Sequence, residues 1–349
     1  MDFGAFGYVP ILGVRPSEMQ ALEELSPQVK IGILPYIILQ PWTTAKEFPS
    51  TLAKITACSS GKPIIVDLTD EIFDGNRRPV HAALDLLRDS KDGYVNWRSF
   101  IEEQSTFTPA IQLRVPNEIW PQIVAFKALG RGVVIRLHEQ IFSSAKDIAK
   151  LFKSFPSNED VYFIIDFQKQ DKNILTKALI AYNTCKSIRD EIPDCFISVS
   201  ASTFPSSFTG IAEQEIFERQ FYNLVAAELG TQRNIYCDRA SVRAEKQNGG
   251  GGSPAPRIDN AFAAKWKFFR EAEEEDREEA YQMAAARAIE CPEWKDQGIW
   301  GTEMIKRTAA GQDNAIYSPK LSTSARINIH LHTQSGSDDQ DGEVEWTDL

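Results

Sequence analysis

Short apolar runs alternate with amphipathic stretches of helical period over about the first two thirds of the chain, and this alternation restricts the fold more than any other feature of the sequence. The runs are Tyr8–Val14, Ile33–Leu39, Pro63–Asp67, Pro109–Arg114, Val133–His138, Val161–Asp166, Cys195–Ser200 and Ile235–Asp238. Strands that alternate with helices favour β–α–β units, and a TIM barrel requires eight such units. We therefore predict an α/β protein with a TIM-barrel-like (β/α)8 body.

Side chains of different character alternate within the runs. In Val133–His138, for example, three aliphatic residues lie on one face of an extended strand, and Arg136 and His138 lie on the other. In a barrel the wholly apolar face meets the surrounding helices and the mixed face points inward. The polar inward positions fall near the ends of the runs, where barrel proteins place their sites.

The stretches between the runs carry apolar residues at helical spacing. Helices are predicted within Ser17–Lys30, Asn117–Leu129, Ser144–Phe155, Lys172–Glu191 and Ala212–Leu229. The longest interval, Thr69–Thr108, is expected to hold a helix and a loop that contains Trp97, and long loops on the strand-exit side often form lids.

The composition changes after the eighth run. We expect the barrel to occupy 1–245, a Gly/Pro-rich connector 246–256, a C-terminal helical extension packed on the barrel 257–334, and an acidic disordered tail 335–349. Within the extension, Ala261–Glu290 reads as one long helix, and the alternating segment Arg326–His332 is typical of an edge strand.

Charge and composition exclude several classes of function. The net charge is −11, of which the tail carries −6 on acids alone, and Lys and Arg are dispersed without a basic stripe, so direct nucleic-acid binding is not expected. No apolar stretch is long enough for a membrane span, and the N-terminus has no secretion signal, so a cytoplasmic location is expected. Five widely spaced cysteines, with Cys58 interpreted as a loop thiol, are predicted to be reduced.

Ionisable residues at the ends of the runs form the candidate site. They are Asp67, Arg114, Arg136, His138, Asp166 and Asp238, with Ser198 and Ser200 beside them. Carboxylates and an imidazole can move protons, and guanidinium groups form forked contacts with phosphate or carboxylate. We therefore assign catalysis to Asp67, His138, Asp166 and Asp238, and ligand binding to the arginines and serines. An ion-pair network that fills the barrel end and fixes strand register explains the same residues equally well.

Recognisable cofactor, metal and nucleophile signatures are absent from the sequence. It has no HExxH pair, Walker loop, GxGxxG or GxSxG motif, and no lysine at a strand end. His330 and His332 would share one face of an edge strand, but no further ligands lie close in sequence. We expect no metal and no cofactor.

Several segments, taken in order, resemble the phage and bacterial beta protein family. They include Tyr8–Leu12, Arg136-Leu137, Ile164–Asp166, Ser202–Pro205, Asp238, Arg257 with Trp266 and Arg270, Gly301–Ile305 and Asn328–His330. The resemblance spans almost the whole chain. Members are found in prophages, satellite phages and defence islands, near toxin-like or nuclease-like proteins, and one resembles an antidote to a killing protein.

The resemblance implies a function but no reaction. We predict a cytoplasmic regulatory or immunity component, antitoxin-like, of an anti-phage defence module. Its partner would be a toxin-like or nuclease-like protein encoded nearby, and its barrel mouth would hold an anionic small molecule, with Arg257 added to the ligand-binding residues. The alternative is a TIM-barrel hydrolase or lyase acting on a phosphate-bearing, nucleotide-like molecule, with Asp67 or Asp166 as base and His138 as acid. A scaffold with a filled barrel is a third interpretation, so whether the protein is an enzyme stays open.

Overall fold

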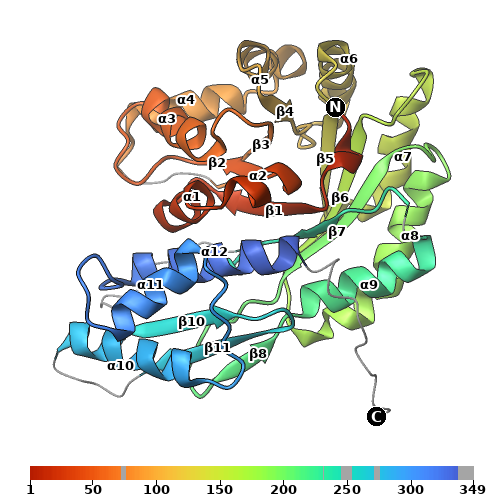
Figure 1. Ribbon diagram of the computed structural model, residues 1–349. Helices are drawn as coiled ribbons and strands as arrows, with labels where there is room; N and C mark the ends of the chain where they lie inside the picture. Colours follow the sequence, from red (N-terminus) through yellow and green to blue (C-terminus); the bar gives the residue numbers. More distant parts are fainter. Residues whose placement is uncertain (72–75, 231, 245–253, 271–275, 337–349) are drawn as a thin grey trace.

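The computed structural model is a mixed α/β protein that describes residues 1–71, 76–230, 232–244, 254–270 and 276–336 (Figure 1). Two parallel sheets form its body, one in the order β4-β3-β2-β1-β9 and the other in the order β5-β6-β7. The strands are β1 (Tyr8–Gly13), β2 (Tyr36–Leu39), β3 (Ile64–Leu68), β4 (Phe107–Pro109), β5 (Val133–His138), β6 (Val161–Lys169), β7 (Phe196–Ser202) and β9 (Tyr236–Asp238). Each of the eight predicted runs overlaps one of these strands, although the fourth shares only Pro109 with β4.

The two parallel sheets meet at both of their edges. Single parallel bridges join Ala110, just after β4, to Val134 of β5, and Ile197 of β7 to Asn234, just before β9. The backbone N–H of Ile111 donates to the Val134 carbonyl at 2.9 Å, and that of Ile235 donates to the Ile197 carbonyl at 3.1 Å. The edges are therefore joined by sparse backbone contacts, in contrast to the continuous ladders within each sheet.

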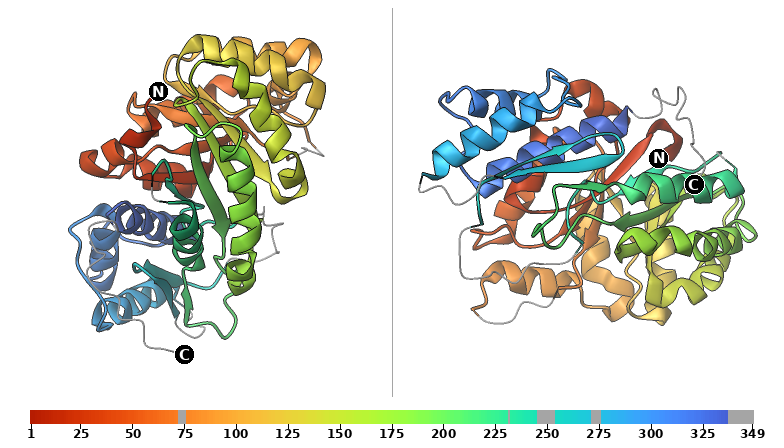
Figure 2. Two further views of the ribbon diagram at one scale, coloured as in Figure 1. Left: turned by 90° about the vertical axis from the view of Figure 1, so that its right-hand side faces the viewer. Right: turned by 90° about the horizontal axis from the view of Figure 1, so that it is seen from below.

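Helices cover the outer faces of the sheets (Figures 1 and 2). They are α1 (Pro16–Glu23), α2 (Pro27–Gly32), α3 (Phe48–Ser59), α4 (Pro79–Leu87), α5 (Lys91–Glu103), α6 (Ile119–Leu129), α7 (Ala145–Lys150), α8 (Ala178–Arg189) and α9 (Phe217–Leu229). Short 3-10 turns are η1 (Phe3–Ala5), η2 (Pro116–Glu118), η3 (Glu139–Ser144), η4 (Leu151–Ser154) and η5 (Lys172–Lys177).

Three local predictions in this region were wrong. The single helix expected over Ser17–Lys30 is interrupted, because Pro27 cannot donate a helical hydrogen bond and Ser26 instead caps a second helix. Trp97 lies on α5 and not in a loop; it is fully buried and its indole N–H donates to the Ala110 carbonyl at 3.1 Å. Cys58 lies on α3 and is buried, where desolvation raises the pKa of its thiol to about 12.

The strands bury apolar side chains on both faces. Val133, Ile135 and Leu137 pack with the helices in the largest apolar cluster, as the alternation predicted. The next residue along, Val134, belongs to a separate cluster that also holds Tyr162 and other side chains from the opposite faces of the strands. The mixed face is thus apolar over much of its length, and its charged residues are restricted to the carboxyl ends.

The C-terminal extension is an α/β layer, so its prediction as mainly helical was only partly right. It contains β10 (Arg257–Ala261) and β11 (Lys265–Arg270), which form an antiparallel sheet with β8 (Glu213–Glu215) in the order β10-β11-β8. Its helices are α10 (Arg277–Glu290), α11 (Trp300–Ala309) and α12 (Pro319–Ser335). The long helix predicted over Ala261–Glu290 was wrong, because its first part forms a hairpin strand in which Trp266 and Phe268 are buried on one face. Most of the predicted connector and of the acidic tail lies outside the described residues.

The edge strand predicted at Arg326–His332 was also wrong, because this segment belongs to α12. Ser318 caps that helix and Pro319 occupies its first turn, which is a strong start signal. The helix packs against α1 on one side and β10 on another, so residues all around it are buried and no single apolar stripe is present. Its polar residues find buried partners instead: the amide of Asn328, for example, donates to the Ala21 carbonyl at 3.1 Å.

A buried carboxyl group on α9 fixes the loop that follows β7. Oε1 of Glu218 accepts a hydrogen bond from the backbone N–H of Thr203 and Oε2 accepts one from the Thr203 hydroxyl, both at 2.6 Å. Burial raises the pKa of Glu218 to about 7, and the two hydrogen bonds oppose that rise without cancelling it. The group therefore titrates near neutral pH in the folded protein.

The Glu218 carboxyl predicts a pH dependence of stability. Its pKa in the folded protein lies above the value of about 4.5 that an unburied glutamate has, so its contribution to stability is fully present below about pH 4.5 and is lost as the pH rises through about 7. The loss amounts to about 3 kcal/mol at most, because one pKa unit corresponds to about 1.4 kcal/mol. In urea unfolding between pH 4.5 and 8, we expect Glu218→Gln to flatten this fall and the exposed control Glu228→Gln to leave it unchanged. An identical slope in wild type and Glu218→Gln would contradict the assignment.

Candidate functional site

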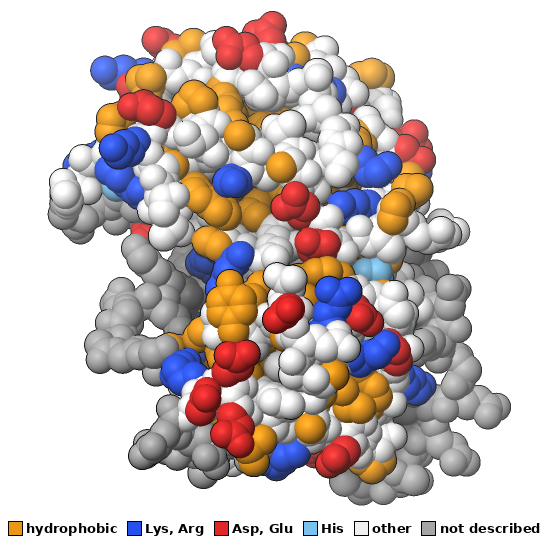
Figure 3. All heavy atoms as spheres, turned by 60° about the vertical axis from the view of Figure 1, so that its left-hand side comes forward, with side chains coloured by type: hydrophobic (Ala, Val, Ile, Leu, Met, Phe, Trp, Pro, Cys, Tyr) orange, Lys and Arg blue, Asp and Glu red, His pale blue; other side chains and the backbone are white. Residues whose placement is uncertain are grey.

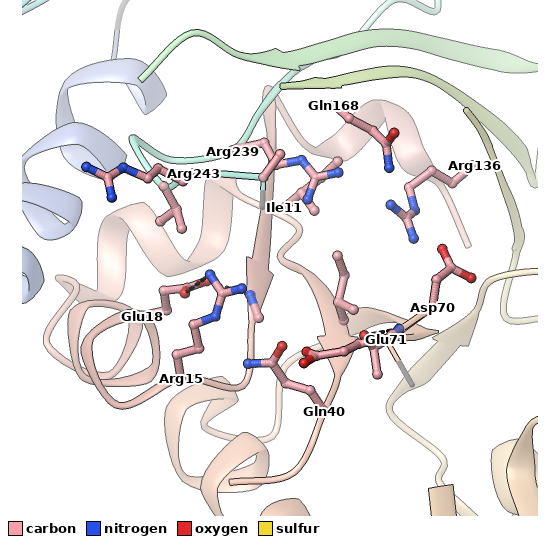
Figure 4. Close-up of a pocket in the computed structure, with 15 residues that line it drawn as sticks. Ile11, Arg15, Glu18, Gln40, Asp70, Glu71, Arg136, Gln168, Arg239 and Arg243 are labelled. Atoms are coloured by element: carbon pink, nitrogen blue, oxygen red, sulfur yellow. Dashed lines mark hydrogen bonds and ion pairs between the residues drawn. The ribbon is translucent and has the colours of Figure 1, made fainter. Parts of the chain in front are cut away.

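A cavity of about 230 Å³ lies at the carboxyl ends of β1, β2, β3, β6 and β9 (Figure 4). It is lined by Ile11, Gly13, Arg15, Glu18, Ile38, Gln40, Thr69, Asp70, Glu71, Arg136, Gln168, Arg239, Val242, Arg243 and Ala244. We call this space the mouth cavity. Figure 4 shows the guanidinium groups of Arg136 and Arg239 and the amide of Gln168 directed into it, whereas Arg243 extends away toward the C-terminal extension.

A buried row of alternating charges lies at this cavity. Arg136 on β5 donates from Nη2 to Oδ2 of Asp67 at 2.6 Å, and from Nη1 to Oδ2 of Asp166 at 3.2 Å. Arg239, which directly follows β9, donates to the same Asp166 oxygen at 2.5 Å. All four side chains are less than a tenth exposed. Buried charges of this kind require pairing, because an unpaired one would cost several kcal/mol.

Neutral hydrogen-bond donors complete the surroundings of Asp67. The hydroxyl of Tyr36 donates to Oδ2 at 2.7 Å, and the amide of Gln112 donates to Oδ1 at 2.8 Å. Burial alone would raise the pKa of Asp67, but Arg136 and these hydrogen bonds outweigh it and hold the pKa below its usual value. The pKa of Asp166 is likewise lowered, because Arg239 and Arg136 outweigh burial. Both groups are therefore carboxylates at neutral pH and have no proton to donate.

His138 ends β5 beside this row. Its Nε2 lies 3.9 Å from Oδ2 of Asp166 and has no hydrogen-bond partner among the described residues. Burial, together with the neighbouring charge of Arg136, lowers the pKa of His138 even though Asp166 opposes the shift. The imidazole is therefore neutral at pH 7, which suits it to accept a proton and not to donate one.

Asp238 belongs to a separate buried cluster. Its carboxylate accepts hydrogen bonds from the hydroxyls of Tyr8 and Tyr236 at 2.5 and 2.8 Å, and its Oδ2 lies 2.7 Å from Nε2 of His330 on α12. Burial raises the pKa of Asp238, but His330 and the hydrogen bonds reverse that effect and lower it. The cluster fastens the C-terminal extension to β1 and β9.

The other predicted site residues lie apart from the mouth cavity. The Ser198 hydroxyl is buried within the body, where it donates to the Ile235 carbonyl and lies 2.5 Å from the Tyr162 hydroxyl. Ser200 is also buried. Arg257 lies on β10 and pairs with Asp259. Neither serine nor Arg257 lines the mouth cavity.

Arg114 is exposed and does not join the buried charges. The strand predicted at Pro109–Arg114 was displaced: β4 runs from Phe107 to Pro109, Ala110 and Ile111 still pair with Val134 of β5, and the chain leaves the sheet after them. Gln112, two residues earlier, does reach Asp67, because its long side chain returns from the loop toward β3.

Sequence reasoning missed Arg239 and the tyrosines. Arg239 stands immediately after the eighth run, so a rule that considers the first residue beyond each strand would have found it. Tyr8, Tyr36 and Tyr236 occupy strand positions that were counted as apolar, although a buried tyrosine hydroxyl normally needs a hydrogen-bond partner.

The described residues give no support to a metal centre or a basic stripe. No group of three or more His, Cys, Asp or Glu side chains in this part of the chain is placed to hold a metal ion. His330 and His332 are two apart on a helix, so they do not share a face. Figure 3 shows cationic and anionic side chains intermixed over one face of the molecule. None of the described helices combines the length and apolar character that crossing a bilayer requires.

Comparison with known proteins supports the resemblance seen in the sequence. The model of the family described as Beta protein matches residues 8–336. The chain is also 27% identical to Protein beta of Enterobacteria phage P4 over 343 residues, which cover 95% of this chain and 94% of that protein. The alignment thus runs through the body and the extension alike, including β3, β5, β6, β9 and α12, which supply the buried charges. The chain belongs to the Beta protein family.

Proposed function

We propose that this protein is a regulatory component that binds a small anionic ligand in the mouth cavity. The observation that carries the proposal is that Arg136 and Arg239 direct guanidinium groups into the cavity at the ends of the parallel strands (Figure 4). A guanidinium has five N–H donors, and their carboxylate partners do not use all of them. In particular, Nε of Arg239 is buried and has no hydrogen-bond partner among the described residues.

The lining also indicates what kind of anion would fit. Arg15 is paired with Glu18 at 3.1 Å, so it is partly neutralised. Asp70 and Gln168 face the same space and offer acceptors as well as a donor (Figure 4). A ligand that carries hydroxyl groups beside one phosphate or carboxylate would pair its anionic group with the arginines and its hydroxyls with Asp70 and Gln168, which a bare anion cannot do. The cavity volume of about 230 Å³ restricts the ligand to a small molecule.

A closed (β/α)8 barrel is part of the proposal. The bridges between Ala110 and Val134 and between Ile197 and Asn234 support it, because they connect the two sheets at both edges. In a closed barrel the apolar cluster around Tyr162 and Ile164 would fill the interior, and the mouth cavity would occupy the end at which barrel proteins bind ligands.

Binding fits the charges better than acid–base catalysis by the two aspartates. Asp67 and Asp166 are paired with guanidinium groups and keep lowered pKa values, so each is a weak general base and has no proton to donate as an acid. From the setting expected for the Beta protein family, we further propose that ligand binding belongs to an antitoxin-like immunity role in an anti-phage defence module. In that role the protein would restrain a toxin-like or nuclease-like partner encoded nearby.

A second candidate function is hydrolysis or elimination on a phosphate-bearing molecule. His138 favours it, because its Nε2 lies 3.9 Å from the Asp166 carboxylate, is without a hydrogen-bond partner in the described part of the chain, and has a lowered pKa. In this scheme His138 would serve as the base, not as the acid that the sequence suggested, and the arginines would bind the phosphate.

Replacing Arg239 tests the ligand site. We expect ribose 5-phosphate, inorganic phosphate or malate, tested by calorimetry, to bind the wild type, and Arg239→Met to weaken binding at least tenfold through loss of a charge-assisted contact worth about 1.5–3 kcal/mol. Asp166 keeps Arg136 in this variant, so the fold should survive. Arg114→Met is the matched control, because Arg114 is exposed outside the cavity, and it should bind as wild type. An equal loss of ligand affinity in both variants would contradict binding in the mouth cavity.

Native mass spectrometry tests the partner. The chain purified from cells that also express its neighbouring genes should carry an added protein mass, and Arg239→Met should reduce that complex if ligand and partner are linked. Only the bare chain mass, in repeated preparations at low salt, would argue against a stable partner.

Replacing His138 tests the second candidate. With p-nitrophenyl phosphate or its diester as substrate, we expect His138→Ala to lower turnover at least a hundredfold, and activity to fall as the pH drops and the imidazole gains a proton. His332→Ala is the matched control, because His332 lies on α12 and lines a different cavity, whereas His138 lies beside Asp166 and Arg136. Tight anion binding without turnover would exclude this candidate for these ester classes.

A further inference from the structure

A second and larger cavity, of about 710 Å³, lies where the C-terminal extension meets the body. We call it the junction cavity. The loop after β7, the strands β10 and β11, and the first turns of α12 contribute to its lining. Arginines dominate the charge of its described lining: Arg15, Arg243, Arg257, Arg270 and Arg326 line the cavity, and Glu18 is the only acid among the described residues that do so. Glu18 is already engaged, because it pairs with Arg15 and accepts from the Gly13 N–H at 2.6 Å.

One buried carboxylate serves two of these arginines. Nη1 of Arg326 lies 2.7 Å from Oδ2 of Asp259, and Nη2 of Arg257 lies 2.8 Å from the same oxygen. Asp259 is 2% exposed and Arg326 is 4% exposed, so this group is shielded from water. Two positive charges therefore share a single negative charge at the wall of the cavity.

The remaining two arginines contact backbone carbonyls. Nε of Arg243 donates to the Pro205 carbonyl at 2.9 Å, and Arg270 donates to the carbonyls of Phe208 and Ile211. Burial lowers the pKa of Arg243, and the positive charge of Arg257 lowers it further. Burial, in spite of Asp259, also lowers the pKa of Arg326 to about 10. The cavity thus holds more positive charge than the described residues neutralise.

Aromatic rings hold the guanidinium groups in place. The Arg257 guanidinium carbon lies 3.4 Å from the centre of the Phe208 ring, and that of Arg243 lies 5.2 Å from the same ring. Arg326 lies over Phe204 at 4.1 Å. Stacking orders a guanidinium without using its N–H donors, which leaves the donors for a ligand. Nε of Arg326 is buried and has no hydrogen-bond partner among the described residues.

The cavity also contains the donors that phosphate groups prefer. Thr323 lies in the early turns of α12, whose N-terminal end carries partial positive charge, whereas the neighbouring Ser322 hydroxyl already donates to the Arg257 carbonyl. Exposed hydroxyls of Ser206, Ser207 and Thr209 lie across the cavity on the loop after β7. The combination of several fixed guanidinium groups, hydroxyls and a helix N-terminus is typical of sites for multiply charged phosphates.

We propose that the junction cavity binds an oligophosphate-bearing small molecule of nucleotide size, with its phosphates on Arg257, Arg243 and Arg270. The charge excess of more than one unit favours an oligophosphate over a monocarboxylate. The volume lies within the range of about 300–1,000 Å³ that is usual for small-ligand sites. On the face shown in Figure 3 cationic and anionic side chains are intermixed, so this face offers a long nucleic acid no continuous basic track. The site is distinct from the mouth cavity, although Arg15, Glu18, Val242 and Arg243 line both.

Calorimetry on the full chain with sodium tripolyphosphate, ATP and AMP tests this site. We expect tripolyphosphate and ATP to bind more tightly than AMP, and Arg257→Met to weaken both at least tenfold. Ser207→Asp provides a second variant, because it adds a negative charge at an exposed lining position without disturbing the packed arginines, and it should weaken binding in the same direction. Arg307→Met, an exposed arginine on α11 that does not line the cavity, is the matched control and should bind within twofold of wild type.

Arg239→Met distinguishes this site from the proposed function. Arg239 lines only the mouth cavity and Arg257 lines only the junction cavity, so each variant should lose one class of ligand and keep the other. Tighter binding of ATP than of tripolyphosphate would assign the ligand as a nucleotide, and equal binding would assign recognition to the phosphates alone. The proposal is overturned if neither compound binds wild type at millimolar concentration, if Arg257→Met and Ser207→Asp both bind normally, or if a single-stranded oligonucleotide binds while the small phosphates do not.

Discussion

The position of Arg136 between Asp67 and Asp166 is the interaction on which the rest of the structure depends. Desolvating three charged groups costs several kcal/mol for each ion, and close pairing must offset that cost. Asp67 lies on β3 in the larger parallel sheet, whereas Arg136 and Asp166 lie on β5 and β6 in the smaller one. The row therefore forms only when both sheets are in place with the correct register.

The ion pairs reinforce the two sheet edges where the backbone is weakest. One isolated bridge joins β4 to β5 and another joins β7 to the residue before β9, but Asp67–Arg136 crosses the first junction and Asp166–Arg239 crosses the second. Removing Arg136 would leave Asp67 without its cationic partner, and removing Asp166 would do the same to Arg239, which is far more costly than losing a surface salt bridge. The same guanidinium groups line the mouth cavity, so the residues that join the sheets also supply its positive charge.

The eight strands of the parallel sheets could be predicted from the sequence because their signal is local, whereas β8, β10 and β11 were missed. Each apolar run overlaps one of the eight strands, and the charged residues Asp67, Arg136 and Asp166 do meet, as expected for the carboxyl ends of neighbouring parallel strands. Prediction failed where burial depends on a partner distant in sequence. The alternation in Arg326–His332 indicates a strand, but it arises because Arg326 pairs with Asp259 of β10 and His330 contacts Asp238 across the interface with the body. The expectation that Arg114 joins these charges was not met for a related reason, since nothing in the sequence shows that the fourth strand stops at Pro109.

The two cavities share four lining residues, and the direction of the Arg243 side chain determines which cavity receives its positive charge. Arg243 extends toward the C-terminal extension, donates to the Pro205 carbonyl and lies 5.2 Å from the Phe208 ring, so its positive charge falls mainly on the junction cavity (Figure 4). Arg15, the other shared arginine, is paired with Glu18. The mouth cavity therefore relies on Arg136 and Arg239, which the body supplies, whereas the junction cavity relies on arginines that β10, β11 and α12 contribute. Because Asp238 and His330 fasten α12 to β1 and β9, the arginines of the extension keep a fixed position relative to the mouth cavity.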